Sequence, residues 1–269
     1  MSELQDEVRS GSPSSPQLVP PSRPKTVLQK LYPERRFSRV VRDEGKFLFY
    51  SIVADLLESH HVVMDFGAGR GHQIDAVSGH LRTLLDFRGR CKTVIAVDPD
   101  EAVLTNPFVD EAHVIDEAGR IPLPDNSVDI ITSFAVLEHV ADPAQVVDEL
   151  YRVLRPGGWF CAWTPNKWGY VGIGVRMIPN RLHERLVPLA EPRDTRQSID
   201  VFRTAYKLNI VKDIARLFGR ERFHNHSFTA NGSPSYHFGS IVIARFWQLV
   251  MALSPAKGRK TLFVFVQRR

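Results

Sequence analysis

The pattern of apolar and polar positions changes its period repeatedly along the middle of the chain. Short apolar runs, which are typical of buried strands, alternate with segments whose apolar residues recur at three- and four-residue steps, which predict helices. Strands separated by helices favour right-handed crossovers and a parallel sheet with helices on both faces, an α/β fold. Strands are predicted at residues 62–66, 93–97, 112–115, 129–134 and 159–164, and helices at 73–87 and 143–154.

The predicted helix 143–154 has clear boundary signals. Asp142 is a suitable N-cap, and Pro143 stands at the first helical position, where the N–H that proline lacks has no helical partner. The apolar residues of this helix form one stripe. The Pro-Gly-Gly run at 156–158 then ends the helix and turns the chain into the next strand.

The segments before this core are different in character. Residues 1–24 hold six Ser and five Pro among few large apolar residues, so we expect a disordered tail. Residues 25–60 show a helical pattern, with apolar positions at steps of three and four between Phe47 and Leu56. The core is expected at residues 61–165. We expect the helical lead-in to cover the mouth of a ligand site there, because its basic cluster of Arg35, Arg36, Arg39 and Arg42 lies just before the core.

The last third of the chain is less regular. Asn209 is predicted to cap a helix that ends before Gly219, and strands are predicted at 223–229 and 262–266. Between these strands lies an almost wholly apolar run, 241–253, which is too short to span a bilayer. We expect this run to be buried, with a dimer or membrane surface as the alternatives.

The composition fits a soluble globular protein, with 43% hydrophobic and 24% charged residues in a chain of 269. The two cysteines, Cys91 and Cys161, lie far apart beside apolar stretches, so we expect free thiols in a reducing compartment. The sequence shows neither a secretory signal nor an apolar run long enough to span a bilayer. A cytoplasmic location is the resulting expectation.

The net charge of +5 hides a strong asymmetry. Residues 1–150 carry 15 Lys and Arg against 24 Asp and Glu, whereas residues 151–269 carry 20 against 6. This asymmetry either describes an ordinary solvated surface or indicates an anionic partner, such as a phosphorylated or nucleotide-linked substrate, an acidic glycan or a membrane face. Nucleic acid is disfavoured because no recognised nucleic-acid motif accompanies the charge.

The most informative motif is a glycine-rich run that follows the first strand. Residues 62–71 read Val-Val-Met-Asp-Phe-Gly-Ala-Gly-Arg-Gly, with Gly67, Gly69 and Gly71 at every second position after Asp65. Glycines in a strand-to-helix turn let the backbone take φ > 0 and let a ligand approach main-chain N–H groups, so a carboxylate or phosphate could bind there. The dinucleotide fingerprint needs a small residue at position 72, where this chain has His.

An acidic residue, Asp98, ends the second predicted strand. A carboxylate at this place can accept both ribose hydroxyls of a nucleoside, although NAD enzymes also place an acid there. Asp98 therefore supports a nucleoside without choosing which one. The alternative is that Asp98 before Pro99 simply forms a turn.

Three motifs in the same order resemble the type-11 group of class I S-adenosylmethionine (SAM)-dependent methyltransferases. They are the D-x-G-x-G-x-G run from Asp65, the Glu138-His139 pair after the fourth strand, and Arg-Val-Leu-Arg-Pro-Gly-Gly at 152–158. The resemblance covers about residues 61–165. It implies a Rossmann-like sheet of order 3-2-1-4-5-7-6 with strand 7 antiparallel, for which 262–266 is the candidate, and SAM as the cofactor.

The resemblance also implies a set of cofactor contacts. The glycine loop would hold the methionine part of SAM, Asp98 the ribose, and an acid with the following main-chain N–H the adenine. Counting back from Pro122 puts Glu117 and Ala118 at the adenine positions, whereas the usual Asp would be Asp116, so both acids are kept. The full set is Asp65, Gly67, Ala68, Gly69, Gly71, Asp98, Pro99, Asp116, Glu117, Ala118, Ser133 and Phe134.

SAM carries its own activation as a sulfonium, so the protein mainly has to orient the acceptor atom in line with the methyl–sulfur bond. Orientation of this kind can supply roughly 7 kcal/mol of the barrier reduction. An alcohol acceptor also needs a general base, and His139 is the best-placed candidate, unless it only stabilises its loop. His183 with Glu184, and Tyr206, are weaker base candidates. His224 and His226 have metal-like spacing but lack a third ligand in the sequence pattern, and no metal is predicted.

Residues 166–269 would form a basic acceptor-side region that also contains the last strands. Its aromatic and basic residues could bind a sugar phosphate or nucleotide, or could cover a core edge. We expect an anionic small-molecule or glycan-type acceptor methylated at oxygen. The alternatives are a nicotinamide-dependent oxidoreductase and a non-catalytic SAM-binding module. Peripheral membrane contact and the oligomeric state stay open. The aromatic and basic residues that could bind such an acceptor are Trp168, Tyr170, Arg176, Arg181 and Arg185.

Overall fold

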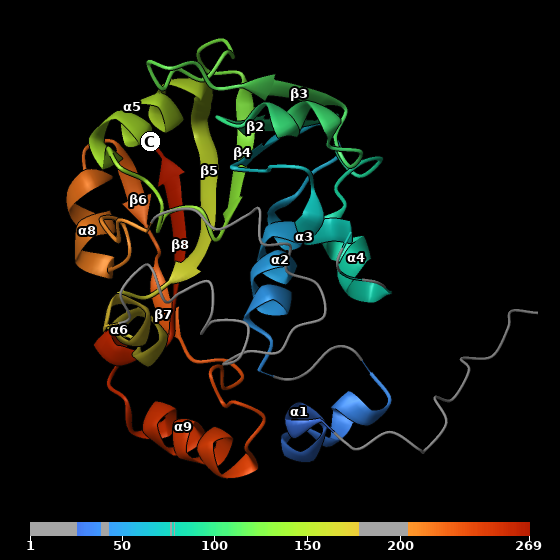
Figure 1. Cartoon of the computed structure of the whole chain (residues 1–269). Coiled ribbons are helices and arrows are strands. Elements are labelled where there is room, and N and C mark those ends of the chain that lie inside the picture. Colours follow the sequence, from blue (N-terminus) through green and yellow to red (C-terminus); the bar gives the residue numbers. More distant parts are fainter. Residues whose placement is uncertain (1–25, 39–42, 76, 78, 178–203) are drawn as a thin grey trace, which may run out of the picture.

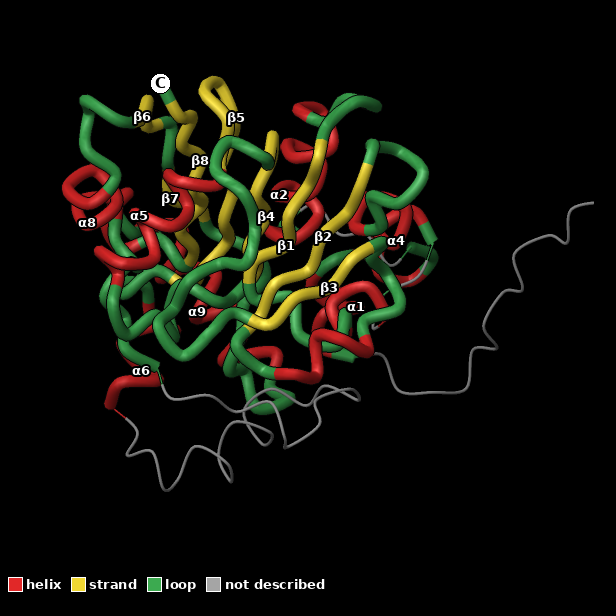
Figure 2. Tube along the Cα trace, turned by 90° about the horizontal axis from the view of Figure 1, so that it is seen from above, coloured by secondary structure: helices red, strands yellow, loops and turns green. Residues whose placement is uncertain are grey.

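The structure is a computed structural model that describes residues 26–38, 43–75, 77, 79–177 and 204–269. The described residues form an eight-stranded sheet with helices on both sides (Figures 1 and 2). The expected tail 1–24 lies outside the described residues.

The strand order is β3-β2-β1-β4-β5-β8-β6, and β7 also pairs with β8. Pairing is parallel from β3 to β5, and β8 is antiparallel to β5, β6 and β7. The order confirms the predicted Rossmann-like sheet, with β8 in the place of strand 7. The strands are β1 Val62–Phe66, β2 Thr93–Asp98, β3 Glu111–Val114, β4 Val128–Phe134, β5 Leu154–Pro165, β6 Phe223–Asn225, β7 Phe228–Ala230 and β8 Thr261–Arg268.

Alternate residues of each central strand serve two hydrophobic cores, because successive side chains point to opposite faces of a sheet. Met64 of β1 packs with the core under α5 (Pro143–Val153) and α8 (Val211–Leu217). Val63 packs with the other core, under α2 (Gly45–Leu56) and α4 (His80–Leu85). Cys91 and Cys161 are free thiols, as predicted, and burial raises the pKa of Cys161.

The prediction of one long helix at 73–87 was wrong in extent. The chain forms two short helices, α3 (His72–Asp75) and α4, and Gly79 between them has φ +64. A left-handed residue cannot continue a right-handed helix, so Gly79 breaks the pattern. In α2 the buried face is formed by Phe49, Tyr50 and Val53.

Helix α5 confirms its predicted boundaries. Asp142 Oδ1 accepts hydrogen bonds from the main-chain N–H groups of Ala144 (3.1 Å) and Gln145 (3.2 Å). The helix ends at Val153, and β5 begins at once with a bulge at residues 155–158. Gly157 in that bulge has φ +82.

The sixth predicted strand, 223–229, is split into β6 and β7. Both halves pair with β8, and at the break the N–H of His226 donates to the carbonyl of Phe265 at 2.8 Å. The N–H of Phe265 in turn donates to Ser227 Oγ at 3.2 Å. The interruption is therefore a local irregularity in one edge strand.

Asn209 does not cap the following helix as predicted. Its amide nitrogen donates to Thr164 Oγ1 (2.6 Å) and to the carbonyl of Pro165 (3.1 Å) at the end of β5. Ile210 holds the N-cap position of α8 without a side-chain cap. Gly219 does follow the end of this helix, with φ +28.

Helix α9 (Ile241–Leu253) corrects the expectation of burial. Only Ala244 and Met251 of this helix are buried, while several of its large apolar side chains are exposed. The inner side of α9 packs on α1 (Val27–Leu31), so α1 of the lead-in segment lies against α9. Within the described residues, none of the helices has the length and apolarity needed to cross a bilayer. The remaining elements are α6 Tyr170–Met177 and the 3-10 turns η1 Pro33–Arg36, η2 Glu101–Thr105 and η4 Ala256–Gly258.

Candidate cofactor and methyl-transfer site

The glycine loop joins β1 to α3 in a conformation that only glycine adopts without strain. Gly67, Gly69 and Gly71 have φ of +77, +48 and +76. The N–H of Gly67 donates to the carbonyl of Val97 at 2.8 Å, which holds the start of the loop against β2. The loop therefore has a fixed path at the carboxyl edge of the sheet, where ligands bind in open α/β folds.

The three glycines have different surroundings. A side chain on Gly67 would collide with Val136, and one on Gly71 would collide with Asn106 and come within 2.7 Å of Phe108. A side chain on Gly69 would meet no protein atom within 4 Å. Gly67 and Gly71 are therefore required by packing, whereas Gly69 faces open space. The sequence alone does not distinguish the three glycines in this respect.

Asp98 ends β2 beside this loop, as predicted. Its Oδ2 accepts a hydrogen bond from the N–H of Gly69 (2.9 Å), and its Oδ1 accepts one from the N–H of Asp100 (2.9 Å). Burial raises the pKa of Asp98, and these two hydrogen bonds oppose the rise. Each carboxylate oxygen retains a second lone pair, so the group can still accept hydroxyl donors. The Asn106 side chain fixes the loop from below by donating to the Gly69 carbonyl at 3.2 Å.

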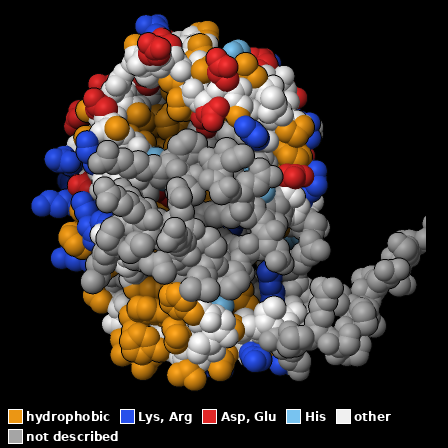
Figure 3. Space-filling view, in the orientation of Figure 1, with side chains coloured by type: hydrophobic (Ala, Val, Ile, Leu, Met, Phe, Trp, Pro, Cys, Tyr) orange, Lys and Arg blue, Asp and Glu red, His pale blue; other side chains and the backbone are white. Residues whose placement is uncertain are grey.

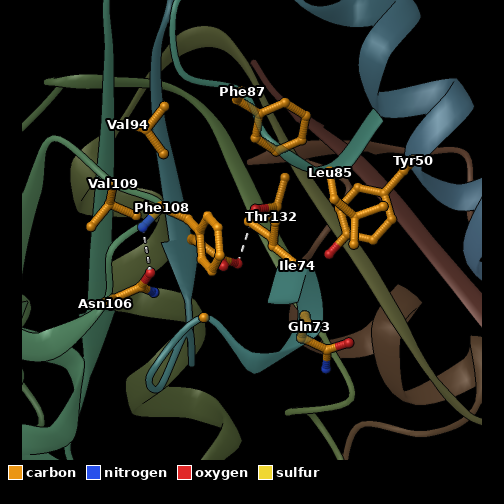
Figure 4. Close-up of a pocket in the computed structure, with 12 residues that line it drawn as sticks. Tyr50, Gln73, Ile74, Leu85, Phe87, Val94, Asn106, Phe108, Val109 and Thr132 are labelled. Atoms are coloured by element: carbon orange, nitrogen blue, oxygen red, sulfur yellow. Dashed lines mark hydrogen bonds between the residues drawn. The ribbon is translucent and has the colours of Figure 1, made fainter. Parts of the chain in front are cut away.

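Asp65, the first acid of the motif, lies in β1 just before the glycine loop. Thr132 Oγ1 donates to Asp65 Oδ1 at 3.1 Å. Burial raises the pKa of Asp65 to about 6, and the nearby Asp98 charge adds to the rise, while the Thr132 hydrogen bond opposes it. Asp65 also lines a small cavity whose walls include Thr132, Asn106 and Phe108 (Figure 4).

A second loop follows β4 and packs on the first. Ala135 has φ +58, an uncommon conformation for a residue with a side chain, and its N–H donates to the carbonyl of Trp163 at 2.8 Å. Val136 then fills the space over Gly67. Backbone strain of this kind is concentrated at functional sites, and Ala135 carried no signal in the sequence.

Ser133 and Phe134, the two cofactor-contact residues predicted at the end of β4, both contact neighbouring groups of the protein. Ser133 is buried and donates its hydroxyl hydrogen to the carbonyl of Phe66 at 3.0 Å. The Phe134 ring stacks on Trp163, with centroids 4.5 Å apart and planes inclined by 6°. The Lys46 ammonium lies 4.5 Å from the Phe134 centroid and donates to Gln73 Oε1 at 2.6 Å. Lys46 brings a positive charge to this edge and was missed from the sequence.

The Glu138-His139 pair occupies the turn after β4. Glu138 is buried, and its Oε2 accepts a hydrogen bond from Thr164 Oγ1 at 2.8 Å. Asn209 donates to the same hydroxyl, so a continuous chain of hydrogen bonds holds Glu138. The carbonyl of Glu138 accepts the N–H groups of Ala205 (2.6 Å) and Tyr206 (3.1 Å). His139 is half-buried. Its main-chain N–H donates to the carbonyl of Val136 at 2.8 Å, which fixes the turn.

The third loop follows β3 and starts next to Asp98. The N–H of Ile115 donates to the Asp98 carbonyl at 3.0 Å. Asp116 closes a tight turn, since its Oδ1 accepts the N–H of Arg120 at 2.7 Å. Glu117 is exposed, and among the described residues its carboxylate has no hydrogen-bond partner. The carbonyl of Ala118 accepts a hydrogen bond from Gln145 of α5.

The weaker base candidates and the metal-like histidines do not add to this site. Burial, followed by the negative charge of Glu138, raises the pKa of Tyr206, which makes Tyr206 a poor base. In the part of the chain that the structure describes, the one group spaced for a metal is Glu58, His60 and His61, and it does not include His224 or His226. Arg39, Arg42, Arg181, His183, Glu184 and Arg185 lie outside the described residues.

The aromatic residues after β5 divide between core and surface. Tyr170 stacks on Trp247 of α9 at 4.3 Å, and its hydroxyl accepts the N–H of Ser235 at 2.7 Å, so Tyr170 fixes α6 to α9. Trp168 is half exposed, with the Arg176 guanidinium 5.2 Å from its ring. Of this predicted pair, only Trp168 is left on the surface.

Comparison with known proteins agrees with this geometry. Residues 64–162 match the family described as a methyltransferase domain. Over 110 residues the chain is 39% identical to a probable S-adenosylmethionine-dependent methyltransferase of Mycolicibacterium smegmatis, covering 39% of this chain and 38% of that protein. A similarly named protein of Mycobacterium tuberculosis is 34% identical over 110 residues, covering 39% and 36%. The match therefore spans less than two fifths of the length of these relatives.

A solved structure shares the fold over most of the chain. It is titled as a complex between the Haloferax volcanii Trm112 methyltransferase activator and the putative methyltransferase, and it has a TM-score of 0.51 at 16% identity. The alignment covers 84% of this chain and 92% of that one. The family match, the strand order and the loops at the carboxyl edge agree, so residues 64–162 form a class I SAM-dependent methyltransferase domain whose cofactor is SAM.

Proposed function

We propose that the protein transfers the methyl group of SAM, in line, to an oxygen of an anionic small-molecule or glycan-type acceptor. The observation that carries the cofactor part is the pairing of Gly69 with Asp98. Gly69 leaves open space beside its backbone, and Asp98, held by the Gly69 N–H, lies at the edge of that space.

In this proposal Gly69 and the loop main chain contact the methionine part of SAM, and Asp65 supports that loop from below. Asp98, followed by Pro99, would receive the ribose hydroxyls. Glu117 and Ala118 would contact the adenine, since Asp116 already uses its carboxylate to close the turn with Arg120.

Bound SAM supplies the activated methyl group, and the residues of the chain orient the two reactants. Ser133 ties the end of β4 to β1, and Phe134 and Trp163 form an aromatic wall beside it. His139 follows in the turn after β4 and would take the proton from an alcohol acceptor as the new carbon–oxygen bond forms.

The proposed acceptor is anionic because positive charge gathers near the same edge. Lys46 lies over Phe134, and Lys167 and Arg176 flank the exposed ring of Trp168 just beyond β5. A guanidinium or ammonium beside an aromatic face is suited to a sugar phosphate or carboxylate.

Calorimetry with SAM, S-adenosylhomocysteine and NAD tests the cofactor part. Binding of the first two ligands and not of NAD is expected, and binding of NAD alone would overturn the proposal. Incubating the protein with SAM and fractionated cell extract, followed by measurement of S-adenosylhomocysteine, tests catalysis. Mass spectrometry of metabolites and glycans from cells with and without the gene then identifies the acceptor and the methylated atom. Binding without turnover on any fraction would indicate a non-catalytic module.

A further inference from the structure

Helix α9 presents a continuous apolar stripe to solvent. Val242, Phe246, Leu249 and Leu253 recur at steps of four, three and four residues and are 74%, 54%, 59% and 76% exposed. These four side chains are called the α9 face below. Figure 3 shows hydrophobic side chains gathered at this end of the molecule, where Figure 1 places α9. Exposed patches of this kind mark interaction surfaces.

The opposite side of α9 is firmly packed, which fixes the direction of the α9 face. Ala244 is fully buried against Val27, Leu31 and Tyr32 of the lead-in segment. Trp247 stacks on Tyr170 of α6. The helix therefore cannot rotate its exposed stripe inward without losing these contacts.

The surroundings of the α9 face are basic. Residues 222–269 contain seven Lys and Arg and neither Asp nor Glu. Arg245 is exposed on α9 itself, and Lys257 and Arg259 are exposed just after it. Lys30 of α1 and Arg176 of α6 are exposed on the two elements that pack beside α9.

We infer that the α9 face docks on the surface of an anionic lipid bilayer, with the helix lying in the plane of the interface. An apolar stripe bordered by Lys and Arg is the pattern of interfacial helices, which bury apolar side chains among the headgroups and attract anionic lipids. Thirteen residues of helix reach about 20 Å, short of the ~30 Å hydrocarbon core, so α9 lies on the membrane.

The charge also argues against a second copy of the chain as the occupant. In a two-fold symmetric dimer the same patch meets itself. Arg245, Lys257 and Arg259 of both copies would then lie in or beside one interface, and the segment 222–269 offers no acid to neutralise them. An anionic surface removes this repulsion.

Docking by α9 would direct the methyl-transfer edge toward the bilayer. α9 leads through η4 to Thr261, which pairs with Pro165, the last residue of β5. In Figure 1 α9 lies beyond the end of the sheet to which β4 and β5 point. The carboxyl edge with the cofactor loops and the α9 face are thus at the same end of the molecule.

Vesicle flotation with the full chain tests this inference. The protein is expected to float with vesicles of phosphatidylcholine and phosphatidylglycerol and to stay behind with phosphatidylcholine alone, with less binding at high salt. Phe246→Glu and Leu249→Glu should each reduce binding at least about tenfold, and Arg245→Ala about fivefold. Val211→Glu, at a 38% exposed position of α8, is the matched control and should bind as the wild type does.

Melting temperature and SAM affinity of each variant verify folding, and the salt dependence of the wild type needs no variant. Absence of flotation with anionic vesicles would overturn the inference. So would equal flotation of Leu249→Glu and the wild type. A concentration-dependent dimer that Leu249→Glu dissociates, without vesicle binding, would assign the α9 face to a second copy instead.

Discussion

The main-chain N–H of Gly69 donates a hydrogen bond of 2.9 Å to Oδ2 of Asp98. This bond joins the loop after β1 to the end of the neighbouring β2. It orients the carboxylate toward the open space beside Gly69, where a side chain would meet no protein atom within 4 Å. The pair thus defines adjoining walls of one site.

Gly69→Val is expected to lower SAM affinity by at least about tenfold, because the new side chain occupies space that the protein leaves open. The left-handed φ should also cost about 1–2 kcal/mol of stability. Calorimetry and urea unfolding measure the two effects. Gly157→Val is the matched control, since Gly157 also has positive φ and open space but lies in the bulge after α5. It should lose similar stability and keep SAM affinity; equal SAM affinities for the two variants would contradict the assignment.

Asp98→Ala should weaken SAM binding about tenfold to a hundredfold, because hydrogen bonds to a charged group contribute roughly 1.5–3 kcal/mol. The control is Asp110→Ala. Asp110 Oδ2 accepts the N–H of Val94 at 2.8 Å, a comparable bond near the opposite end of β2. Asp110→Ala should therefore affect stability but leave SAM affinity intact. A shared loss of affinity would show that Asp98 acts only through the fold.

The raised pKa of Asp65, about 6, predicts a pH-dependent stability term. The folded protein holds this proton more tightly than the unfolded chain does, so the contribution is complete below about pH 4 and is lost as the pH rises through about 6. Asp65→Asn keeps an acceptor for Thr132 and removes the titration. Between pH 4 and pH 7 the unfolding free energy of the variant should rise by up to about 3 kcal/mol relative to that of the wild type. Urea unfolding at each pH measures this difference. A difference that does not vary with pH would refute the buried titration.

His139→Asn should lower kcat by a factor of about 10² to 10⁴ while leaving SAM affinity unchanged, if the acceptor atom is a hydroxyl oxygen. Single-turnover formation of S-adenosylhomocysteine measures this, once the acceptor is known. A loss of kcat at an unchanged melting temperature distinguishes a base from a residue that only supports its turn. An unchanged kcat would assign His139 to that turn and favour an acceptor that needs no base.

Substitution should distinguish the roles of the two acids of the third loop, Asp116 and Glu117. Glu117→Ala is expected to weaken binding of adenosine and SAM alike, with little change in stability, because the side chain is exposed. Asp116→Ala removes the acceptor for the N–H of Arg120 and should cost roughly 1 kcal/mol of stability. Titration with adenosine alone makes the comparison. If Asp116→Ala selectively weakened adenosine binding, the register would move back by one residue.

The features that could be predicted from the sequence depend on residues that are close together along the chain. The boundaries of α5 follow from Asp142 and Pro143, which act within one turn of the chain. The glycine loop, Asp98 and the Glu138-His139 turn each follow a strand directly, so parallel pairing alone brings them to one edge. Thr132, Asn106 and Lys46 could not be assigned to the site, because each acts on a residue far away in the sequence.

The sequence by itself determined the sheet, its strand order through the family motifs, the cofactor class and the loops that meet at the carboxyl edge. Only the tertiary structure decided that Gly69 is the open glycine, that Asn209 supports Glu138 instead of capping α8, and that α9 exposes an apolar stripe. Strand periods, caps and motifs depend on neighbouring residues, whereas the surroundings of a side chain depend on which distant segments pack against it.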